Sequence, residues 1–252
     1  MDEQDFSKVA IKLIPTYNEK ENIASLTQAV FNLYPHTSMM VLDDNSPDGT
    51  AQAVRNLQVL FPNLYLNQRT SDRGFGKSYL EGFKKVLADD RYKAIVMMDA
   101  DFSHDPKVIG SMLEKLKDYE VVNGSRYISG GKIENWKWHR RLLSNFANFY
   151  VRTILRVPLQ DMTTGFVCLR KDALQRVDLN TIYSDGYAFL VELKYKLLQT
   201  GSRFYEFPIV YTERREGGSK MSSRVIWESI WLPWKLCFKT SPLKKQVSSR
   251  ST

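Results

Sequence analysis

Two aspartates stand two residues apart directly after the apolar run at 94–98, which reads Ala-Ile-Val-Met-Met. Side chains alternate between the two faces of an extended chain, so Asp99 and Asp101 would point to the same side and could bind one cation. Ser103 continues the same alternation. Oxygen ligands without histidine or thiolate favour a hard ion, so the pattern predicts a Mg2+ or Mn2+ site completed by water and substrate phosphates. An isolated Asp-x-Asp is more often a solvated turn, but its position after a buried strand favours the metal site.

Two further polar segments follow apolar runs in the same way. PTYNE begins at Pro15, and DDNSPDGT begins at Asp43. In open α/β sheets ligands bind beyond the carboxyl ends of the strands, so these segments are candidates for the same site. Asp44 could accept hydrogen bonds from a base or a ribose. The end of the second segment, at 48–50, has turn and helix-capping chemistry, which predicts a structural role.

A glycine-containing loop, Arg-Gly-Phe-Gly-Lys at 73–77, precedes a predicted helix. Glycines there would let the backbone approach a pyrophosphate at the helix N-terminus, with Lys77 as the counter-charge. The same residues are equally compatible with an ordinary helix start.

Short apolar runs alternate with helical patterns from Val9 onward. The strands are too apolar for a sheet with one solvated face, which favours a mostly parallel sheet with helices on both faces. The first long helix, expected at about 19–33, carries a capping box in which Asn18 caps and Glu21 reaches back. After about residue 128 the pattern changes to long, aromatic-rich helical stretches without a linker. We therefore expect a single catalytic domain over 1–239 and a disordered basic tail at 240–252.

The chain has 252 residues, a formal net charge of +8 at pH 7 and a pI near 9.3. Excess positive charge favours an anionic partner, which could be nucleic acid, a phospholipid surface or a phosphorylated substrate. A non-catalytic basic module at a membrane or on nucleic acid is one alternative, but carboxylates at the strand ends would repel both partners. We therefore expect no nucleic-acid partner. No run of 18 apolar residues is present and the first residues are acidic and polar, so we expect a cytoplasmic protein that does not span a membrane.

Six motifs in one order, between residues 9 and 222, resemble those of the family-2 glycosyltransferases. They are PTYNE, DDNSPDGT, DADFSHDP, NGSRY, DMTTGF and RREGGSKMS. Within that family they are most similar to the dolichol-phosphate mannosyltransferase (polyprenyl-phosphate mannose synthase) group. The resemblance implies a glycosyltransferase-A fold, which is a Rossmann-like α/β sheet.

The resemblance also implies roles on the donor side. The residues expected to hold the nucleoside are Pro15, Tyr17, Glu19 and Asp44. Asp99 and Asp101 would be the metal-binding pair, with Ser103 as a third and weaker ligand. The segment at 161–165 matches one that lines the donor site, although a strand-entry turn is the alternative.

The acceptor side is expected to be rich in arginine. A phosphate monoester is already an anion and needs no proton removed, so arginines rather than a general base would bind it. Arg126 follows the apolar run Glu-Val-Val and falls at a predicted strand end. The resemblance implies that acceptor or donor phosphates are bound by Arg126, Arg140, Arg214, Ser219 and Lys220. Arg126 and Arg214 are expected to be essential for catalysis, and the choice between Arg140 and Arg141 is open.

Two amphipathic stretches, near 135–156 and 222–239, combine tryptophans and other apolar residues with arginines and lysines. This composition suits a membrane interface, where tryptophan rings rest at headgroup depth. Core helices are the alternative. We expect a protein peripheral at the cytoplasmic face of a membrane, and the sequence leaves open a separate membrane-anchoring subunit.

The reaction implied by the resemblance transfers mannose from GDP-mannose to a polyprenyl (dolichyl-type) phosphate. It would be metal-dependent and inverting, and would give polyprenyl β-mannosyl phosphate. One alternative is a polyprenyl-phosphate glucosyltransferase that uses UDP-glucose. Another is a family-2 transferase to a saccharide hydroxyl, which would need a carboxylate base such as Asp161 or Glu192.

Overall fold

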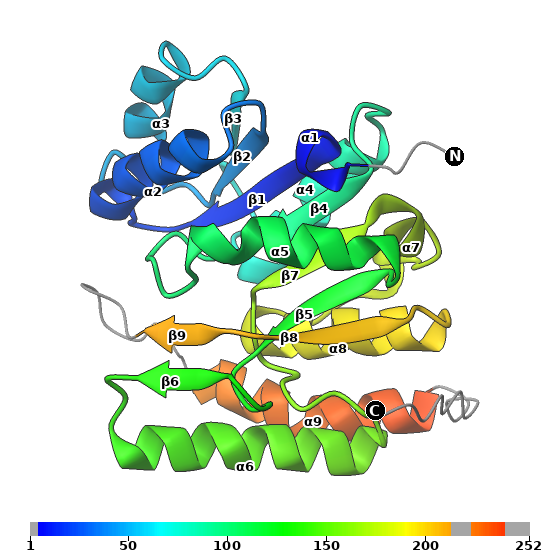
Figure 1. Cartoon of the computed structure of the whole chain (residues 1–252). Coiled ribbons are helices and arrows are strands. Elements are labelled where there is room, and N and C mark those ends of the chain that lie inside the picture. Colours follow the sequence, from blue (N-terminus) through cyan, green and yellow to red (C-terminus); the bar gives the residue numbers. More distant parts are fainter. Residues whose placement is uncertain (1–4, 213–222, 240–252) are drawn as a thin grey trace.

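The computed structural model describes residues 5–212 and 223–239 (Figure 1). Within these residues, seven strands form one sheet in the order β3-β2-β1-β4-β7-β5-β8. Neighbouring strands are parallel except at β7, which runs antiparallel to both β4 and β5. The strands are β1 (Ala10–Thr16), β2 (Ser38–Asp43), β3 (Leu64–Gln68), β4 (Ala94–Met97), β5 (Val121–Ser125), β7 (Val167–Arg170) and β8 (Phe204–Pro208). The predicted mostly parallel, Rossmann-like sheet is therefore confirmed.

Helices connect the strands in the alternation that the sequence indicates. They are α1 (Phe6–Val9), α2 (Lys20–Leu33), α3 (Thr50–Gln58), α4 (Phe75–Leu87), α5 (Ile109–Glu114), α6 (Trp138–Leu155), α7 (Lys171–Gln175), α8 (Gly186–Gln199) and α9 (Ser223–Lys239). Short 3-10 turns are at Pro106–Val108, Lys115–Lys117 and Leu179–Thr181. A second, two-stranded parallel sheet pairs β6 (Lys132–Glu134) with β9 (Val210–Thr212).

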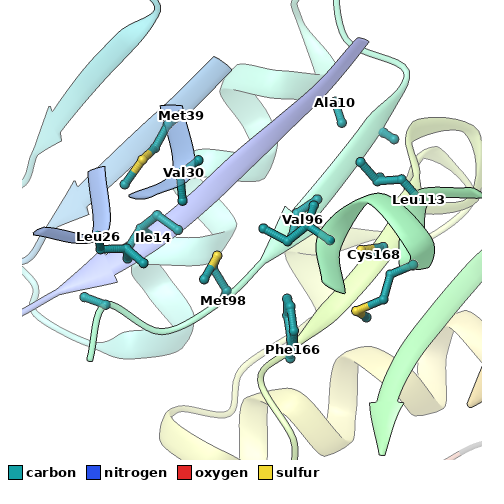
Figure 2. Close-up of a cluster of buried hydrophobic side chains, with 14 of the residues drawn as sticks. Ala10, Ile14, Leu26, Val30, Met39, Val96, Met98, Leu113, Phe166 and Cys168 are labelled. Atoms are coloured by element: carbon teal, nitrogen blue, oxygen red, sulfur yellow. The ribbon is translucent and has the colours of Figure 1, made fainter. Parts of the chain in front are cut away.

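The sheet is covered on both faces, which explains why its strands are apolar at successive positions. On one face Ile14, Val96 and Cys168 pack with residues of α2 and α5, and Figure 2 shows these side chains meeting. On the other face the neighbouring positions Leu13 and Ile95 pack against α4, α7 and α8. Full burial of each such aliphatic side chain stabilises the fold by about 1.5–3 kcal/mol.

A third apolar cluster joins α6, α8 and α9. It includes Val151 of α6, Val191 of α8 and Leu232 of α9. In Figure 1, α6 and α9 lie together at the bottom of the view, below the β8 edge of the sheet. The two stretches that the sequence marks as amphipathic are therefore helices that pack on each other beside the main sheet.

The start of α2 differs from the predicted capping box. The helix begins at Lys20 with Glu19 as its N-cap residue, which makes no side-chain capping bond, and Asn18 has a φ of 58°. The loop after β2 and the first residue of α3 supply the capping instead. Thr50 Oγ1 accepts from Glu19 N at 3.0 Å, and Asp48 Oδ2 accepts from Lys20 N at 3.1 Å. The structural role predicted for 48–50 is therefore confirmed.

Within 5–212 and 223–239, no helix combines the length and the apolar character that a membrane crossing requires.

Candidate active site

The two aspartates of the predicted metal site lie in the loop after β4, not on the strand itself. β4 ends at Met97, and the chain turns at Phe102, whose φ is 59°. The strand alternation used for the prediction therefore does not extend to these positions. The Asp99 side chain is 26% exposed, whereas Asp101 is only 3% exposed. Asp99 is the more accessible of the two carboxylates.

Ser103 is held against Asp101 in this loop. Its Oγ donates to Asp101 Oδ1 at 2.6 Å, and its main-chain N donates to the same oxygen at 3.1 Å. In the part of the chain that the structure describes, no group of three or more His, Cys, Asp or Glu side chains could hold a metal. Two carboxylates and a hydroxyl still fit Mg2+ or Mn2+, because such ions commonly keep waters and bind substrate phosphates alongside one or two carboxylates.

His104 contacts the loop that carries Asp99 and Asp101 through a main-chain hydrogen bond. Its Nδ1 accepts a hydrogen bond from Asp99 N at 3.1 Å, and its ring stacks on Phe166 at 4.8 Å between centroids. Burial lowers the pKa of His104 to about 4, so the ring is neutral at pH 7. A neutral ring with an accepting Nδ1 carries its proton on Nε2. His104 therefore fixes the backbone of Asp99 and acts as a support for the predicted ligands.

Asp44 directly follows β2 and anchors the loop before α4. Its Oδ1 accepts from Arg69 Nη1 at 2.8 Å, and its Oδ2 accepts from Gly74 N at 2.7 Å. Burial raises the pKa of Asp44. Each carboxylate oxygen has two lone pairs, so a ribose or base could still donate to this group. The expected donor contact of Asp44 stays a prediction.

Arg69 is a residue of this region that the sequence analysis missed. It is buried and donates to Glu81 Oε2 at 3.1 Å and to the Asp72 carbonyl at 2.6 Å, in addition to Asp44. It directly follows β3, which ends at Gln68. The rule that selected the ends of the other strands would therefore have found it.

The glycine loop at 73–77 packs against protein groups. Gly76 N donates to Asp185 Oδ1 at 2.6 Å, as Gly74 N does to Asp44. A Cβ at Gly76 would lie 2.6 Å from the Ser184 carbonyl oxygen, so close packing accounts for this glycine. Lys77 pairs with Asp72 at the surface. This arrangement favours an ordinary helix start over pyrophosphate binding by these amides and Lys77.

The other residues expected to hold the nucleoside lie at the end of β1. Thr16, the last residue of β1, is in register with Asp43 of β2, so the segments after both strands meet at one edge of the sheet. Tyr17 and Glu19 are half-buried there, and Pro15 is half-buried within β1. The structure thus brings these residues together with Asp44.

Arg126 and Asp161 are paired beyond the end of β5. Arg126 Nε donates to Asp161 Oδ2 at 2.7 Å and Nη2 donates to Oδ1 at 2.8 Å. Burial alone would raise the pKa of Asp161, but the charge and hydrogen bonds of Arg126 together with the charge of Lys194 lower it. Arg126 was expected to bind a phosphate. Two of its nitrogens are bonded to a protein carboxylate, and among the described residues none accepts from Nη1, so phosphate binding by Arg126 stays a prediction.

Aromatic rings surround the Arg126 guanidinium. Its Cζ lies 5.3 Å from the ring centroids of both Tyr127 and Tyr211, and 5.7 Å from that of Trp136. Arg140 stacks on the same Trp136 ring, with its Cζ 4.1 Å from the centroid. Trp136 thus brings Arg126 and Arg140 to one place.

Arg141 behaves differently from its neighbour. It is exposed, and its Nη2 donates to the Ile133 carbonyl of β6 at 2.5 Å. Arg140 shares the aromatic cluster with Arg126, whereas Arg141 is tied to a strand backbone. This geometry favours Arg140 as the phosphate-binding neighbour.

Both carboxylates considered as bases for a hydroxyl acceptor are buried and engaged. Asp161 is bound by Arg126. Glu192 Oε2 accepts from the main-chain N of Tyr183 at 3.2 Å, from that of Ser184 at 3.0 Å and from Ser184 Oγ at 2.6 Å. Glu192 therefore shapes the loop before α8.

The segment at 161–165 borders both groups of residues. A Cβ at Gly165 would lie 3.5 Å from Asp99 Oδ1, while Asp161 carries the pair with Arg126. Asn148 of α6 also holds this segment, since its Oδ1 accepts from Met162 N at 2.8 Å. The sequence signal for Asn148 was an amide side chain at helical spacing from the apolar residues Val151 and Leu155, and sequence reasoning missed it.

The aromatic and aliphatic stripe of α6 is exposed, and an exposed stripe of α9 lies beside it. The exposed members are Trp138, Leu142, Leu143, Phe146, Phe149, Ile230, Trp231, Trp234 and Phe238. The two helices are linked by Tyr150, whose hydroxyl donates to the Ile230 carbonyl at 2.8 Å and accepts from Trp234 Nε1 at 2.9 Å. The alternative that these side chains form a core is wrong for the named residues.

Arg214, Ser219 and Lys220 fall within 213–222 and lie outside the described residues, as do the proposed tail at 240–252 and the side chains of 223–229.

The sequence is similar to known glycosyltransferases. The sequence matches the family described as Glycosyl transferase family 2 over residues 13–178. Polyprenol monophosphomannose synthase of Mycolicibacterium smegmatis is 38% identical over 221 residues, which cover 87% of this chain and 83% of that protein. Undecaprenyl-phosphate mannosyltransferase of Micrococcus luteus is 36% identical over 220 residues, which cover 87% of this chain and 90% of that protein.

A solved structure has a fold similar to that of this chain. Glucosyl-3-phosphoglycerate synthase from Mycobacterium tuberculosis, crystallised with Mn2+, UDP-glucose and phosphoglyceric acid, has a TM-score of 0.64 and 15% identity. The match covers 90% of this chain and 80% of that one. At this identity the likeness concerns the fold alone.

Proposed function

The chain belongs to glycosyl transferase family 2, and we propose that it transfers mannose from GDP-mannose to a polyprenyl phosphate. Family membership makes the protein a glycosyltransferase. The relatives from Mycolicibacterium smegmatis and Micrococcus luteus are named for mannose and for polyprenyl-type phosphates. The proposal carries that sugar and that acceptor to this chain.

One observation favours a phosphate acceptor over a saccharide hydroxyl. A hydroxyl acceptor needs a carboxylate or similar base to remove its proton. Asp161 and Glu192, the two candidates, are buried and already accept hydrogen bonds from Arg126 and from the loop before α8. An ionised phosphate needs no such base, and arginines gather nearby. The proposal of a phosphate acceptor rests on these hydrogen bonds, which engage both candidate bases.

The proposed reaction is a single displacement. An oxygen of the acceptor phosphate attacks the anomeric carbon of mannose as the bond from that carbon to the diphosphate oxygen breaks, so GDP departs and the configuration inverts. Arg126 and Arg140 would hold the acceptor phosphate, and Asp44 with the residues after β1 would hold the nucleoside. A divalent cation bound by Asp99 and Asp101, with Ser103 as a weaker ligand, would neutralise negative charge on the departing diphosphate.

The location is part of the proposal. The exposed stripes of α6 and α9 would lie in the interfacial region of the membrane that contains the lipid acceptor, at its cytoplasmic face. Arginines beside these stripes would contact lipid phosphates. Purified protein that binds vesicles without any other protein would need no membrane-anchoring subunit.

The test is a transfer assay with purified full-length protein. It would be incubated with Mn2+, a polyprenyl phosphate, and in turn GDP-mannose, UDP-glucose and other nucleotide sugars. Mass spectrometry of the organic phase should find a hexose on the lipid only with GDP-mannose. Product from UDP-glucose alone would establish the glucosyltransferase alternative. Sugar transfer to a saccharide but not to the lipid would overturn the proposed acceptor.

A further inference from the structure

Lys194 is a fully buried lysine in α8 that neither the donor nor the acceptor assignment uses. It is 1% exposed and lies in a helix whose neighbouring residues Leu193 and Leu197 belong to the core. Burying an ammonium group is costly unless hydrogen bonds compensate for the lost water. A residue retained at such a position is therefore expected to bind a defined set of acceptors.

The acceptors are three carbonyl groups of one segment. Lys194 Nζ donates to the main-chain oxygens of Asp161 at 3.3 Å, Met162 at 3.2 Å and Thr164 at 2.8 Å. An ammonium group has three N–H donors and no acceptor, so its hydrogen-bonding capacity matches these carbonyls. A neutral amine would keep only two donors and would turn its lone pair towards an oxygen.

The opposite side of the same segment organises Arg126. Asp161 Oδ1 accepts from the main-chain N of Thr163 at 3.2 Å and of Thr164 at 3.1 Å, while both Asp161 oxygens accept from Arg126. Thr163 Oγ1 also accepts from Arg126 Nη2 at 2.8 Å. Lys194 holds the carbonyls of this segment, and the segment holds the arginine.

We propose that Lys194 is a positioning residue for the acceptor site, which it serves by fixing the 161–164 segment and thereby the direction of the Arg126 guanidinium. The inference rests on the proposed function, because it assigns Arg126 to the acceptor phosphate. Lys194 does not touch either substrate. Its loss should therefore weaken acceptor binding while donor binding is retained.

The test compares Lys194→Met with a matched control, Lys196→Met. Methionine keeps the length of the side chain and removes the donors. Lys196 is on the same helix, is half-buried and donates to Thr181 Oγ1 at 2.9 Å, away from the 161–164 segment. With Lys194→Met the KM for polyprenyl phosphate should rise about tenfold or more, as expected for a misplaced charged hydrogen bond, while the KM for GDP-mannose stays within about twofold. The control should change neither constant.

Hydrogen exchange gives a readout that does not depend on turnover. The amides of Thr163 and Thr164 should exchange faster in Lys194→Met than in wild type or Lys196→Met. Unchanged exchange together with an unchanged acceptor KM would overturn the inference and leave the proposed function intact. Wild-type protein that transfers nothing to polyprenyl phosphate would instead refute the proposed function, whatever the exchange shows.

A measurement on the unmodified protein covers the case in which Lys194→Met does not fold. Burial lowers the pKa of Lys194 to about 7, against the opposing attraction of Asp161 and Glu206, while Arg126 adds to the lowering. The charge of Lys194 also contributes to the lowered pKa of His104. After correction for intrinsic exchange rates, protection of Thr163 and Thr164 should fall as the pH rises through about 7. Protection that stays constant from about pH 6 to about pH 9 would contradict the proposed role of the ammonium group.

Discussion

Arg126 and Asp161 form a bidentate ion pair that is almost completely buried, with side chains 6% and 0% exposed. Residues after β5 and residues before β7 are thereby joined across the sheet end. A phosphate bound by Arg126 would share the guanidinium with Asp161 and reach it through Nη1. The orientation of this arginine therefore depends on a protein carboxylate that sequence reasoning placed on the donor side.

Asp161→Asn should strongly destabilise the protein. The substitution leaves the buried Arg126 charge without its counter-ion, and removal of one partner from a buried pair costs about 3–5 kcal/mol. Urea unfolding of wild type and variant at pH 7 measures the change in the free energy of unfolding. Asp172→Asn, which breaks the more exposed pair with Arg170, is the matched control and should cost about 1 kcal/mol or less. Equal costs for the two variants would contradict the structural role of the Arg126–Asp161 pair.

Asp99→Ala and Asp101→Ala should each abolish turnover and Mn2+-dependent binding of GDP-mannose. The physical reason is that these two carboxylates would be the protein's negative ligands for a hard cation. Ser103→Ala should have a smaller effect, because it removes only a hydroxyl that is bonded to Asp101. Calorimetric titration of the donor with and without Mn2+ measures binding, and circular dichroism checks the fold. Undiminished activity in Asp101→Ala would refute the metal assignment.

Arg140→Ala and Arg141→Ala should separate the two neighbours. Arg140 shares the aromatic cluster with Arg126, so its loss should weaken acceptor use by about 1.5–3 kcal/mol in kcat/KM, the value of a charged hydrogen bond. Arg141 is bonded to a backbone carbonyl, and its loss should have little effect. Arg214→Ala should impair turnover as strongly as Arg126→Ala, with only partial rescue by lysine. Kinetics over a range of polyprenyl phosphate concentrations decides among these outcomes.

The sheet and the polar residues at its strand ends could be predicted from sequence, because both follow from local sequence patterns. Apolar runs without alternation require a sheet covered on two faces, and residues such as Asp44 and Arg126 follow from the strand ends. The partners of these residues could not be predicted in the same way. Asp161 meets Arg126 from 35 positions away, and the contact depends on how β7 inserts antiparallel between β4 and β5.

The errors have a common physical cause. The capping box was inferred from neighbouring residues alone, whereas Asp48 reaches the amide of Lys20 from another segment. Asp185 likewise reaches the amide of Gly76 in the loop at 73–77, where pyrophosphate binding stays a prediction. The alternation of Asp99 and Asp101 assumed a strand that ends four residues earlier than Asp101. Local sequence specifies which groups need partners, and tertiary packing decides which partners they find.

Lys12 should make the protein more stable as the pH rises above about 8. Burial, opposed by a smaller effect of Cys168, lowers its pKa from 10.5 to about 8. Between these values the folded state has lost the proton that the unfolded state still binds, so stability rises with pH, by about 3 kcal/mol at most. Below about 8 both states are charged and the full cost of burial is present. Chemical unfolding of wild type and Lys12→Met at several pH values should show that this rise is present only in wild type.

The exposed side chains of α9 should bind the protein to anionic vesicles. Trp231 is 65% exposed and Phe238 is 81% exposed, so replacing both by Ser should not unfold the protein. Interfacial aromatic side chains anchor a helix in a way that salt does not screen, whereas each arginine or lysine near the surface adds roughly 1 kcal/mol that salt weakens. Wild type should therefore keep part of its binding at high salt, and the double variant should lose that part.

Leu232→Ser is the contrasting variant, because Leu232 is buried against α6 and α8 and its loss should lower the melting temperature. Vesicle flotation beside a thermal melt separates the two effects, and salt-resistant binding that survives in the double variant would show that α9 does not face lipid.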